Sequence, residues 1–159
     1  MTPEQFQTIF RDYLSPISKY LARRVEPESI EDLASDIFAI AWQKRDYIPS
    51  GSELPWLYKT ARFVVSNHRR KKQVATRFLS TLLPPAAAPS AENLALAEMG
   101  LANSWAALNE KERELLSLSV YEGLTSKEIA KVLDTTENSV NIRLSRVKQK
   151  FLQILKENQ

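Results

Sequence analysis

The sequence predicts an all-α fold of two small helical domains joined by a flexible linker rich in proline and alanine. Of the 159 residues, 43% are hydrophobic, which is enough for a core, and only three are glycine. Apolar residues recur at the three- and four-residue spacing of helices, and the alternating runs typical of strands are scarce. The segment PPAAAPSAEN separates two such helical regions. We therefore expect domains at residues 1–77 and 94–159, with the linker at residues 78–93.

Three helices are expected in the N-terminal domain. The first spans residues 3–24, and Pro16 within it predicts a kink or a division into two consecutive helices. The second, at about residues 28–45, carries a regular apolar stripe that ends at Trp42. The third, at about residues 53–76, follows a loop rich in turn-forming residues.

Two helices are expected at the start of the C-terminal domain. One spans residues 94–108. Asn109 is a suitable N-cap for the next, and Gly123 is suited to close it. Leu115, Leu118 and Val120 on this second helix are candidates for the core.

The stretch TSKEIAKVLDTTENSVNIRLSRVKQK, which starts at Thr125, has the pattern of a helix-turn-helix. Thr125 and Glu128 form a capping box, and the residues DTT at 134–136 favour a turn before a longer helix that Thr136 caps. The longer helix has an apolar stripe, made of Val140, Leu144, Val147, Phe151 and Ile154. Its opposite face carries amide, hydroxyl and basic side chains, which suit the major groove of DNA. The alternative is an ordinary helical hairpin whose charges are solvated.

The third helix concentrates positive charge. Net charge is only +3, yet the chain has no acidic residue between Glu53 and Glu92. Seven cations lie in that interval: Lys59, Arg62, Arg69, Arg70, Lys71, Lys72 and Arg77. Such a segment indicates a polyanionic partner. Phe63 shares the outward face with several of these cations, a composition that binds phosphates while an unpaired base stacks on the ring. The alternative is that Phe63 packs on a neighbour and the cations are solvated.

An acidic face on the second helix, with Asp32, Ser35 and Asp36, has two interpretations. Paired carboxylates can serve acid–base catalysis or bind a metal. Because no histidine lies nearby, an exposed face that is solvated or docks on a basic partner is the better interpretation.

The composition predicts no catalytic site, metal site or cofactor. The chain has no cysteine, which excludes disulfides and thiolate zinc sites, and His68 is its only histidine. The N-terminus is charged, unlike a signal peptide, and the longest uncharged run, residues 78–91, is too short and too rich in proline to span a bilayer. We expect a cytoplasmic protein without membrane insertion.

Taken in order, the segments resemble bacterial sigma factors of the small, extracytoplasmic-function group. EDLASDIFAIAW resembles the region 2.2 helix that binds RNA polymerase, and PWLYKTARFVVSNHRRKK resembles regions 2.3 and 2.4, which melt and read the −10 element. The residues from ALNEKEREL to SRVKQKF resemble region 4, which reads the −35 element. The chain departs from the family pattern at three places: Ser35-Asp36 replaces a common glutamine–glutamate pair, Phe63 replaces an asparagine, and Asn141 replaces a frequent basic residue.

The resemblance implies a transcription initiation factor that is not an enzyme. Its partners would be core RNA polymerase, promoter DNA and an anti-sigma factor. Polymerase binding would fall to Asp32, Ser35, Asp36, Phe38 and Trp42. Contact with the −10 element would fall to Trp56, Lys59, Arg62, Phe63, Arg69 and Arg70. Contact with the −35 element would fall to Thr136, Asn138, Ser139, Asn141, Ile142, Arg143, Ser145 and Arg146.

Two alternatives belong to other functional classes. One is a helix-turn-helix transcriptional regulator that binds a palindromic duplex as a dimer, without being a polymerase subunit. The other is a helical enzyme that uses Asp32 and Asp36 with a divalent metal.

Overall fold

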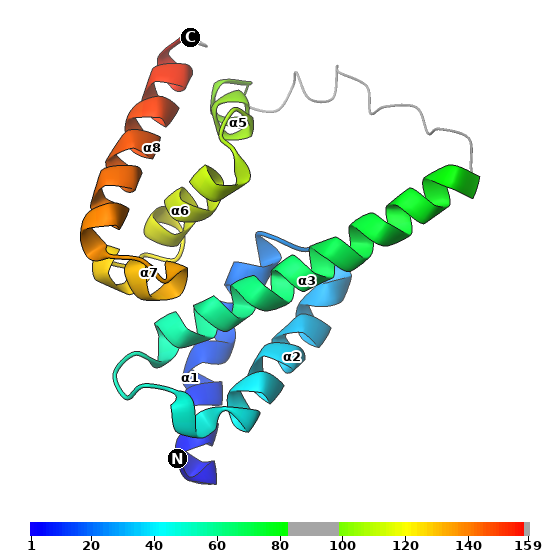
Figure 1. Ribbon diagram of the computed structural model, residues 1–159, viewed down its shortest axis with the longest axis vertical. Helices are drawn as coiled ribbons and strands as arrows, with labels where there is room; N and C mark the ends of the chain where they lie inside the picture. The colour runs from blue at the N-terminus through cyan, green and yellow to red at the C-terminus, as the bar shows by residue number, and fades with distance from the viewer. Residues whose placement is uncertain (83–98, 158–159) are drawn as a thin grey trace. The chain divides into compact units, whose positions relative to one another are not determined.

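A computed structural model describes residues 1–82 and 99–157, and all regular structure in these residues is helical (Figure 1). This confirms the predicted fold class. The chain divides into two compact units, one built mainly from the residues up to 83 and the other mainly from those after it.

The first unit contains three helices, α1 (Pro3–Ala22), α2 (Ile30–Gln43) and α3 (Glu53–Leu82), each packed against the other two. Short 3₁₀ turns at Pro27–Ser29 and Arg45–Tyr47 lie in the two connections. The side chains that fill the core are mainly aliphatic, with two tyrosines; the most completely buried are Ile17, Tyr20, Leu21, Ile37, Ala41, Leu57, Tyr58 and Ala61. Aromatic rings pair across it, for example Tyr20 with Tyr58, whose centroids lie 5.4 Å apart.

The structure excludes one alternative in the first unit and moves one boundary. Pro16 lies inside one continuous helix, so of the two predicted alternatives the division into two consecutive helices is excluded. Ile17, Tyr20 and Leu21, which follow Pro16, are buried and hold that segment in the core. Helix α3 continues to Leu82, through residues 78–82 that the sequence analysis assigned to the linker. No glycine or proline interrupts the chain between Pro55 and that point, so nothing local stops the helix. Residues 83–93 of the expected linker lie outside the described residues.

The second unit contains α5 (Met99–Ala106), α6 (Glu110–Val120), α7 (Ser126–Leu133) and α8 (Glu137–Glu157). Helices α5 and α6 both pack on α8. The helix expected at residues 94–108 is described from Met99 and ends at Ala106, while residues 94–98 lie outside the described residues. The most deeply buried apolar side chains of this unit are Leu108, Leu118, Ile129 and Val140. The expectation that Val120 lies in the core is wrong: it is the last residue of α6 and is 61% exposed.

Side chains at the helix ends confirm the predicted caps. Asn109 with Glu112 and Thr125 with Glu128 form reciprocal capping boxes at the starts of α6 and α7. Gly123, three residues beyond the end of α6 at Val120, adopts a positive φ of 67°. These caps satisfy backbone N–H groups that a helix start leaves without partners, so the sequence determines locally where α6 and α7 begin.

A pair of leucines on α3 tests how the first unit is stabilised. Leu57 is fully buried, whereas Leu79 on the same helix is more than half exposed. We expect Leu57→Ala to lower the free energy of unfolding by about 2–5 kcal/mol, because it removes apolar contacts and leaves a cavity. Leu79→Ala is expected to change it by less than about 0.5 kcal/mol. Urea unfolding followed by circular dichroism measures both, and equal losses would contradict the packing described here.

Candidate nucleic-acid interfaces

Helix α8 presents a polar and basic face to solvent in the second unit. Its apolar stripe faces inward, with Val140, Leu144 and Val147 buried. The residues predicted to contact duplex DNA are all exposed except Ser139, which is half-buried: Thr136, Asn138, Asn141, Ile142, Arg143, Ser145 and Arg146. Amides and guanidinium groups on such a face can pair with base edges or phosphates, and an exposed isoleucine can contact a thymine methyl.

The turn that sets the direction of α8 is built by two residues. Asp134 adopts the left-handed conformation, with φ 54°, and ends α7. Thr136 Oγ1 then accepts a hydrogen bond of 3.1 Å from the backbone N–H of Ser139 and caps α8, as predicted. Since Asp tolerates this backbone region better than most residues, the break follows from the local sequence.

Helix α3 presents a second face, in the first unit. Phe63 is 61% exposed, and Lys59 and Arg70 are exposed with it. At 100° per residue, these three side chains and Ser66 fall within an arc of about 60°. An exposed ring between cations can stack an unpaired base while the cations bind its phosphates. The exposure of Phe63 excludes the alternative that it packs on a neighbour within this unit.

The other residues predicted on this face are partly covered. Trp56, Arg62 and Arg69 are half-buried. Arg69 also donates a hydrogen bond of 3.3 Å from Nη2 to the carbonyl oxygen of Arg24, which draws it toward the connection between α1 and α2. Lys59, Phe63 and Arg70 are therefore the most accessible members of the set.

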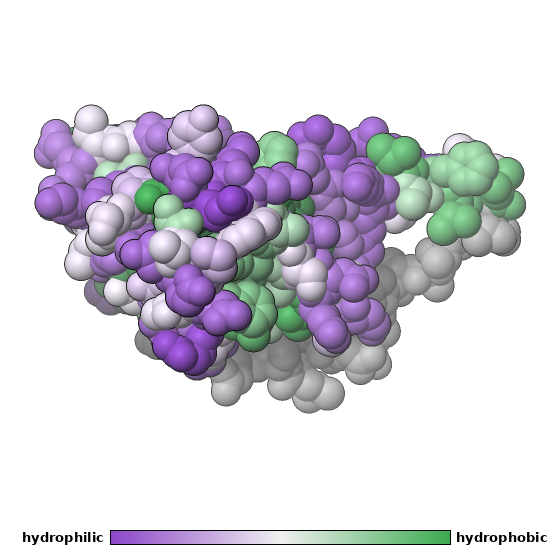
Figure 2. Space-filling view, turned by 90° about the horizontal axis from the view of Figure 1, so that it is seen from below, coloured by the Kyte–Doolittle hydropathy of each residue, from purple (hydrophilic) through white to green (hydrophobic). Residues whose placement is uncertain are grey.

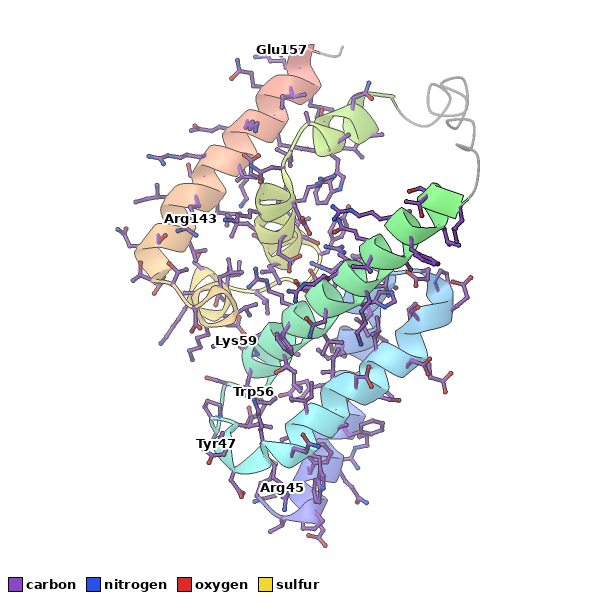
Figure 3. The ribbon with its side chains drawn as sticks, turned by 45° about the vertical axis from the view of Figure 1, so that its right-hand side comes forward. Arg45, Tyr47, Trp56, Lys59, Arg143 and Glu157 are labelled. Atoms are coloured by element: carbon purple, nitrogen blue, oxygen red, sulfur yellow. The ribbon has the colours of Figure 1, made fainter. Side chains whose placement is uncertain are left out.

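Tyr47 is a residue that sequence reasoning missed. It is 80% exposed and lies on the connection that leads into α3, ahead of Trp56 and Lys59 in the first turns of that helix (Figure 3). A tyrosine ring in the open can stack a base in the same way as Phe63. The signal was an aromatic residue placed among turn-forming ones, where a core role is improbable.

Helix α2 presents the acidic face. Asp32, Ser35 and Asp36 are exposed, as predicted. Phe38 is only 4% exposed, because its ring packs edge-on against Phe10 of α1 at 5.0 Å between centroids. The prediction that Phe38 contacts a partner is therefore wrong for this structure, in which the residue belongs to the core.

Trp42, at the end of the same helix, keeps an accessible edge. It is 38% exposed and lies edge-on to Phe6 at 5.0 Å. The guanidinium carbon of Arg45 lies 4.0 Å from its ring centroid. These contacts fix the ring while leaving part of it free for a partner, which fits its predicted role.

A polar cluster around Glu26 joins the α1–α2 connection to α3. Glu26 Oε1 accepts a hydrogen bond of 2.6 Å from Ser29 and lies 2.9 Å from His68 Nε2, and Oε2 accepts one of 3.2 Å from Lys72. The pKa of Glu26 is lowered to about 2, chiefly by the Ser29 hydrogen bond, then by its own backbone N–H and Lys72, with a smaller effect of His68. No sequence spacing pairs Glu26 with His68, so this cluster was not predicted.

Within residues 1–82 and 99–157, no helix is both long and apolar enough to cross a membrane. The same residues contain no group of three or more histidine, cysteine, aspartate or glutamate side chains placed to hold a metal ion.

Two family models match the chain, one in each unit. The model for Sigma-70 region 2 matches residues 9–74, and the model for Sigma-70, region 4 matches residues 102–151. In this order they cover more than half of the chain. The chain belongs to the sigma-70 family. Of the three helices of region 2, α3 carries the exposed aromatic and basic face, and region 4 carries the face of α8.

Curated relatives place the sigma factor in the extracytoplasmic-function group. RNA polymerase sigma factor NccH of Alcaligenes xylosoxydans xylosoxydans is 27% identical over 84% of this chain and 77% of its own length. ECF RNA polymerase sigma factor SigL of Mycobacterium tuberculosis is 24% identical over 87% of this chain and 81% of its own. The sigma factor is thus a transcription initiation factor that binds core RNA polymerase and directs it to promoters by recognising −10 and −35 elements.

A solved structure supports the fold. The sigma factor RpoE from Bartonella quintana, crystallised with the anti-sigma factor NepR, aligns with a TM-score of 0.69 and 19% identity over 98% of this chain and 99% of that one.

The alternative of a regulator that acts without polymerase is not favoured, because region 2 is present together with the helix-turn-helix.

The low pKa of Glu26 predicts how the stability of the sigma factor depends on pH. Because the folded-state pKa of about 2 lies below the ordinary value of 4.5, this carboxylate stabilises the fold above pH 4.5. That contribution is lost as the pH falls from 4.5 toward 2. Urea unfolding of Glu26→Gln between pH 6 and pH 3 should show a weaker pH dependence than the wild type. Glu28→Gln, an exposed neighbour, is the control, and an equal change in both variants would contradict the assignment.

Proposed function

We propose that the functions of this sigma factor are divided among three exposed faces. The acidic face of α2 binds core RNA polymerase, the outward face of α3 holds the −10 element as it opens, and the outward face of α8 reads the −35 element. The observation that carries the proposal is that most members of each predicted set are exposed, on the side of one helix that faces away from its buried stripe. The exceptions are Phe38, which is buried, and four half-buried residues: Trp56, Arg62, Arg69 and Ser139.

The −10 role of α3 rests on an exposed aromatic ring between cations. A melted promoter offers unpaired bases and two phosphate backbones. Phe63 and Tyr47 supply stacking surfaces, and Lys59 and Arg70 supply charge for the phosphates. Stacking tolerates any base, so a phenylalanine at position 63 favours capture of an unpaired base over selection of one base by hydrogen bonds.

The −35 role of α8 rests on its amide and guanidinium groups. Asn138 and Asn141 are suited to bidentate contact with adenine, and Arg143 and Arg146 with guanine or with phosphates. Each bidentate contact is expected to discriminate against a wrong base by about 1–3 kcal/mol. Thr136 and Ser139 act mainly by capping, because their hydrogen bond is internal to the helix start.

The polymerase role of α2 rests on exposed acidic charge. Asp32 and Asp36 lie one turn apart on an exposed face, with Ser35 beside them and Trp42 at its end. Such a face suits a basic partner surface, and Trp42 adds an amphipathic anchor of the kind that dominates interface energies. Phe38 contributes by packing beneath this face.

The three roles imply how function is divided between the two domains and where in the cell the sigma factor acts. We assign polymerase and −10 binding to residues 1–77 and −35 binding to residues 94–159, and the intervening residues connect them. The sigma factor acts in the cytoplasm, where promoters and polymerase lie, and catalyses no reaction itself. RpoE of Bartonella quintana is bound to an anti-sigma factor in its crystal structure. By analogy, we assign this chain an anti-sigma partner that covers its polymerase- and DNA-binding faces.

Run-off transcription tests the polymerase-binding face. Purified core RNA polymerase with a pooled genomic template should give discrete transcripts only when this protein is present. Asp32→Arg/Asp36→Arg is expected to abolish them, because the charge of the face is reversed. The matched control is Glu4→Arg/Asp12→Arg, which makes the same charge change on exposed positions of α1. Equal loss in both would mean that net charge, and not this face, determines binding.

Phe63 tests the −10 face separately from duplex binding. Phe63→Ala should weaken promoter opening by about 1–3 kcal/mol, the contribution of one stacked base. Phe63→Trp should preserve it. Permanganate reactivity of unpaired thymines measures opening, and mobility shift at low temperature measures binding to the closed duplex. If Phe63→Ala opens the promoter as well as the wild type does, the ring has no role in binding the melted region.

A further inference from the structure

The last two to three turns of α3 carry an apolar stripe that nothing in the first unit covers. Its members are aliphatic and aromatic side chains, each between 52% and 64% exposed: Val74, Phe78, Leu79 and Leu82. At 100° per residue they fall within an arc of about 140°. Figure 2 shows hydrophobic colour gathered where α3 ends, at the right of the view. We call these four residues the distal stripe.

The distal stripe continues the core-facing side of α3. Leu57, Ala61 and Val64 lie along the same side of the helix and are buried against α1 and α2. The connection between α1 and α2 ends this packing, because Glu26 meets His68 and Lys72 where α3 leaves the core. Beyond that point the helix still has an apolar side of the kind that packs on another helix, but no helix of the first unit reaches it.

Cations border the distal stripe on both sides. Arg70 and Arg77 lie along one edge and Lys72 along the other, and α3 has no acidic residue after Glu53. A second copy of the same stripe would bring these cations together, which disfavours self-association. Three of the four side chains, Val74, Leu79 and Leu82, are aliphatic and offer little to bases or phosphates, so nucleic acid is a poorer occupant of the stripe as a whole. An amphipathic helix with acidic edges satisfies both the apolar and the charged requirements.

We propose that the distal stripe is the docking site for an amphipathic helix of a partner protein, whose apolar side covers Val74, Phe78 and Leu82 and whose acidic edges pair with Arg70 and Arg77. This inference goes beyond the three faces assigned above, none of which includes the distal stripe. Because Arg70 belongs both to the border of the stripe and to the −10 face, a docked acidic helix competes with promoter phosphates for this cation. Occupation of the stripe therefore weakens −10 binding.

Fluorescence anisotropy with a designed peptide tests the docking site on the full-length chain. The probe is a labelled helix of about 20 residues with leucines on one side and glutamates along both edges, a helix-in-groove ligand. Phe78→Ser/Leu82→Ser should weaken its binding about tenfold or more, since both anchors are lost. Gln73→Ala/Ser80→Ala, on the polar side of the same helix, should leave binding unchanged. A peptide of the same composition with the leucines dispersed should bind at least about tenfold more weakly.

Three results would overturn the proposal. Equal binding of the dispersed peptide would reduce the interaction to charge alone. A wild-type dimer in sedimentation that Phe78→Ser/Leu82→Ser dissolves would assign the stripe to a second copy. Loss of single-stranded DNA binding in that variant would assign it to nucleic acid. Run-off transcription by the variant without peptide should equal that of the wild type, so failure of the stripe and failure of the three-face proposal are distinguishable.

Discussion

Burial of a single stripe on each long helix is the constraint on which the functional faces depend. In α3, the burial of Leu57, Ala61 and Val64 fixes the rotation of the helix about its axis, so Phe63 must face outward. The buried stripe of α8 has the same effect on its amide and guanidinium groups. Apolar burial therefore decides which polar side chains face outward, on the faces that we propose bind nucleic acid.

Features that neighbouring residues determine together are predictable from the sequence. The capping box of Thr125 and Glu128, the left-handed turn at Asp134 and the cap at Thr136 each depend on side chains that reach their own backbone within three or four residues. Helical periodicity also predicts which side of each helix is buried, and therefore that the opposite face of α8 is exposed. At these caps, turns and stripes, local chemistry and tertiary packing favour the same structure, so the sequence pattern alone is sufficient to predict it.

Features that depend on residues distant in the sequence are not predictable from local patterns. Phe38 follows the apolar periodicity of α2, but whether it is core or contact surface is decided by Phe10 on another helix. Glu26 and His68 are 42 residues apart, and no spacing rule connects them. The predicted end of α3 was wrong for a different reason. Residues 78–82 contain no helix breaker, but the prolines that follow them led to a predicted linker that began at residue 78. Tertiary contacts and the absence of a stop signal leave little trace in a single sequence.

Because the chain is divided into two units, a partner that covers one face would weaken promoter binding by the whole factor. Each unit offers only a few base and phosphate contacts, so neither alone should hold a promoter firmly. Covalent connection makes the second contact intramolecular, at an effective concentration in the millimolar range for a short connection, and the joint affinity then exceeds that of either unit. That gain is lost when one face is blocked. A partner seated on the distal stripe, which shares Arg70 with the −10 face, would therefore reduce promoter binding by more than the loss of one phosphate contact.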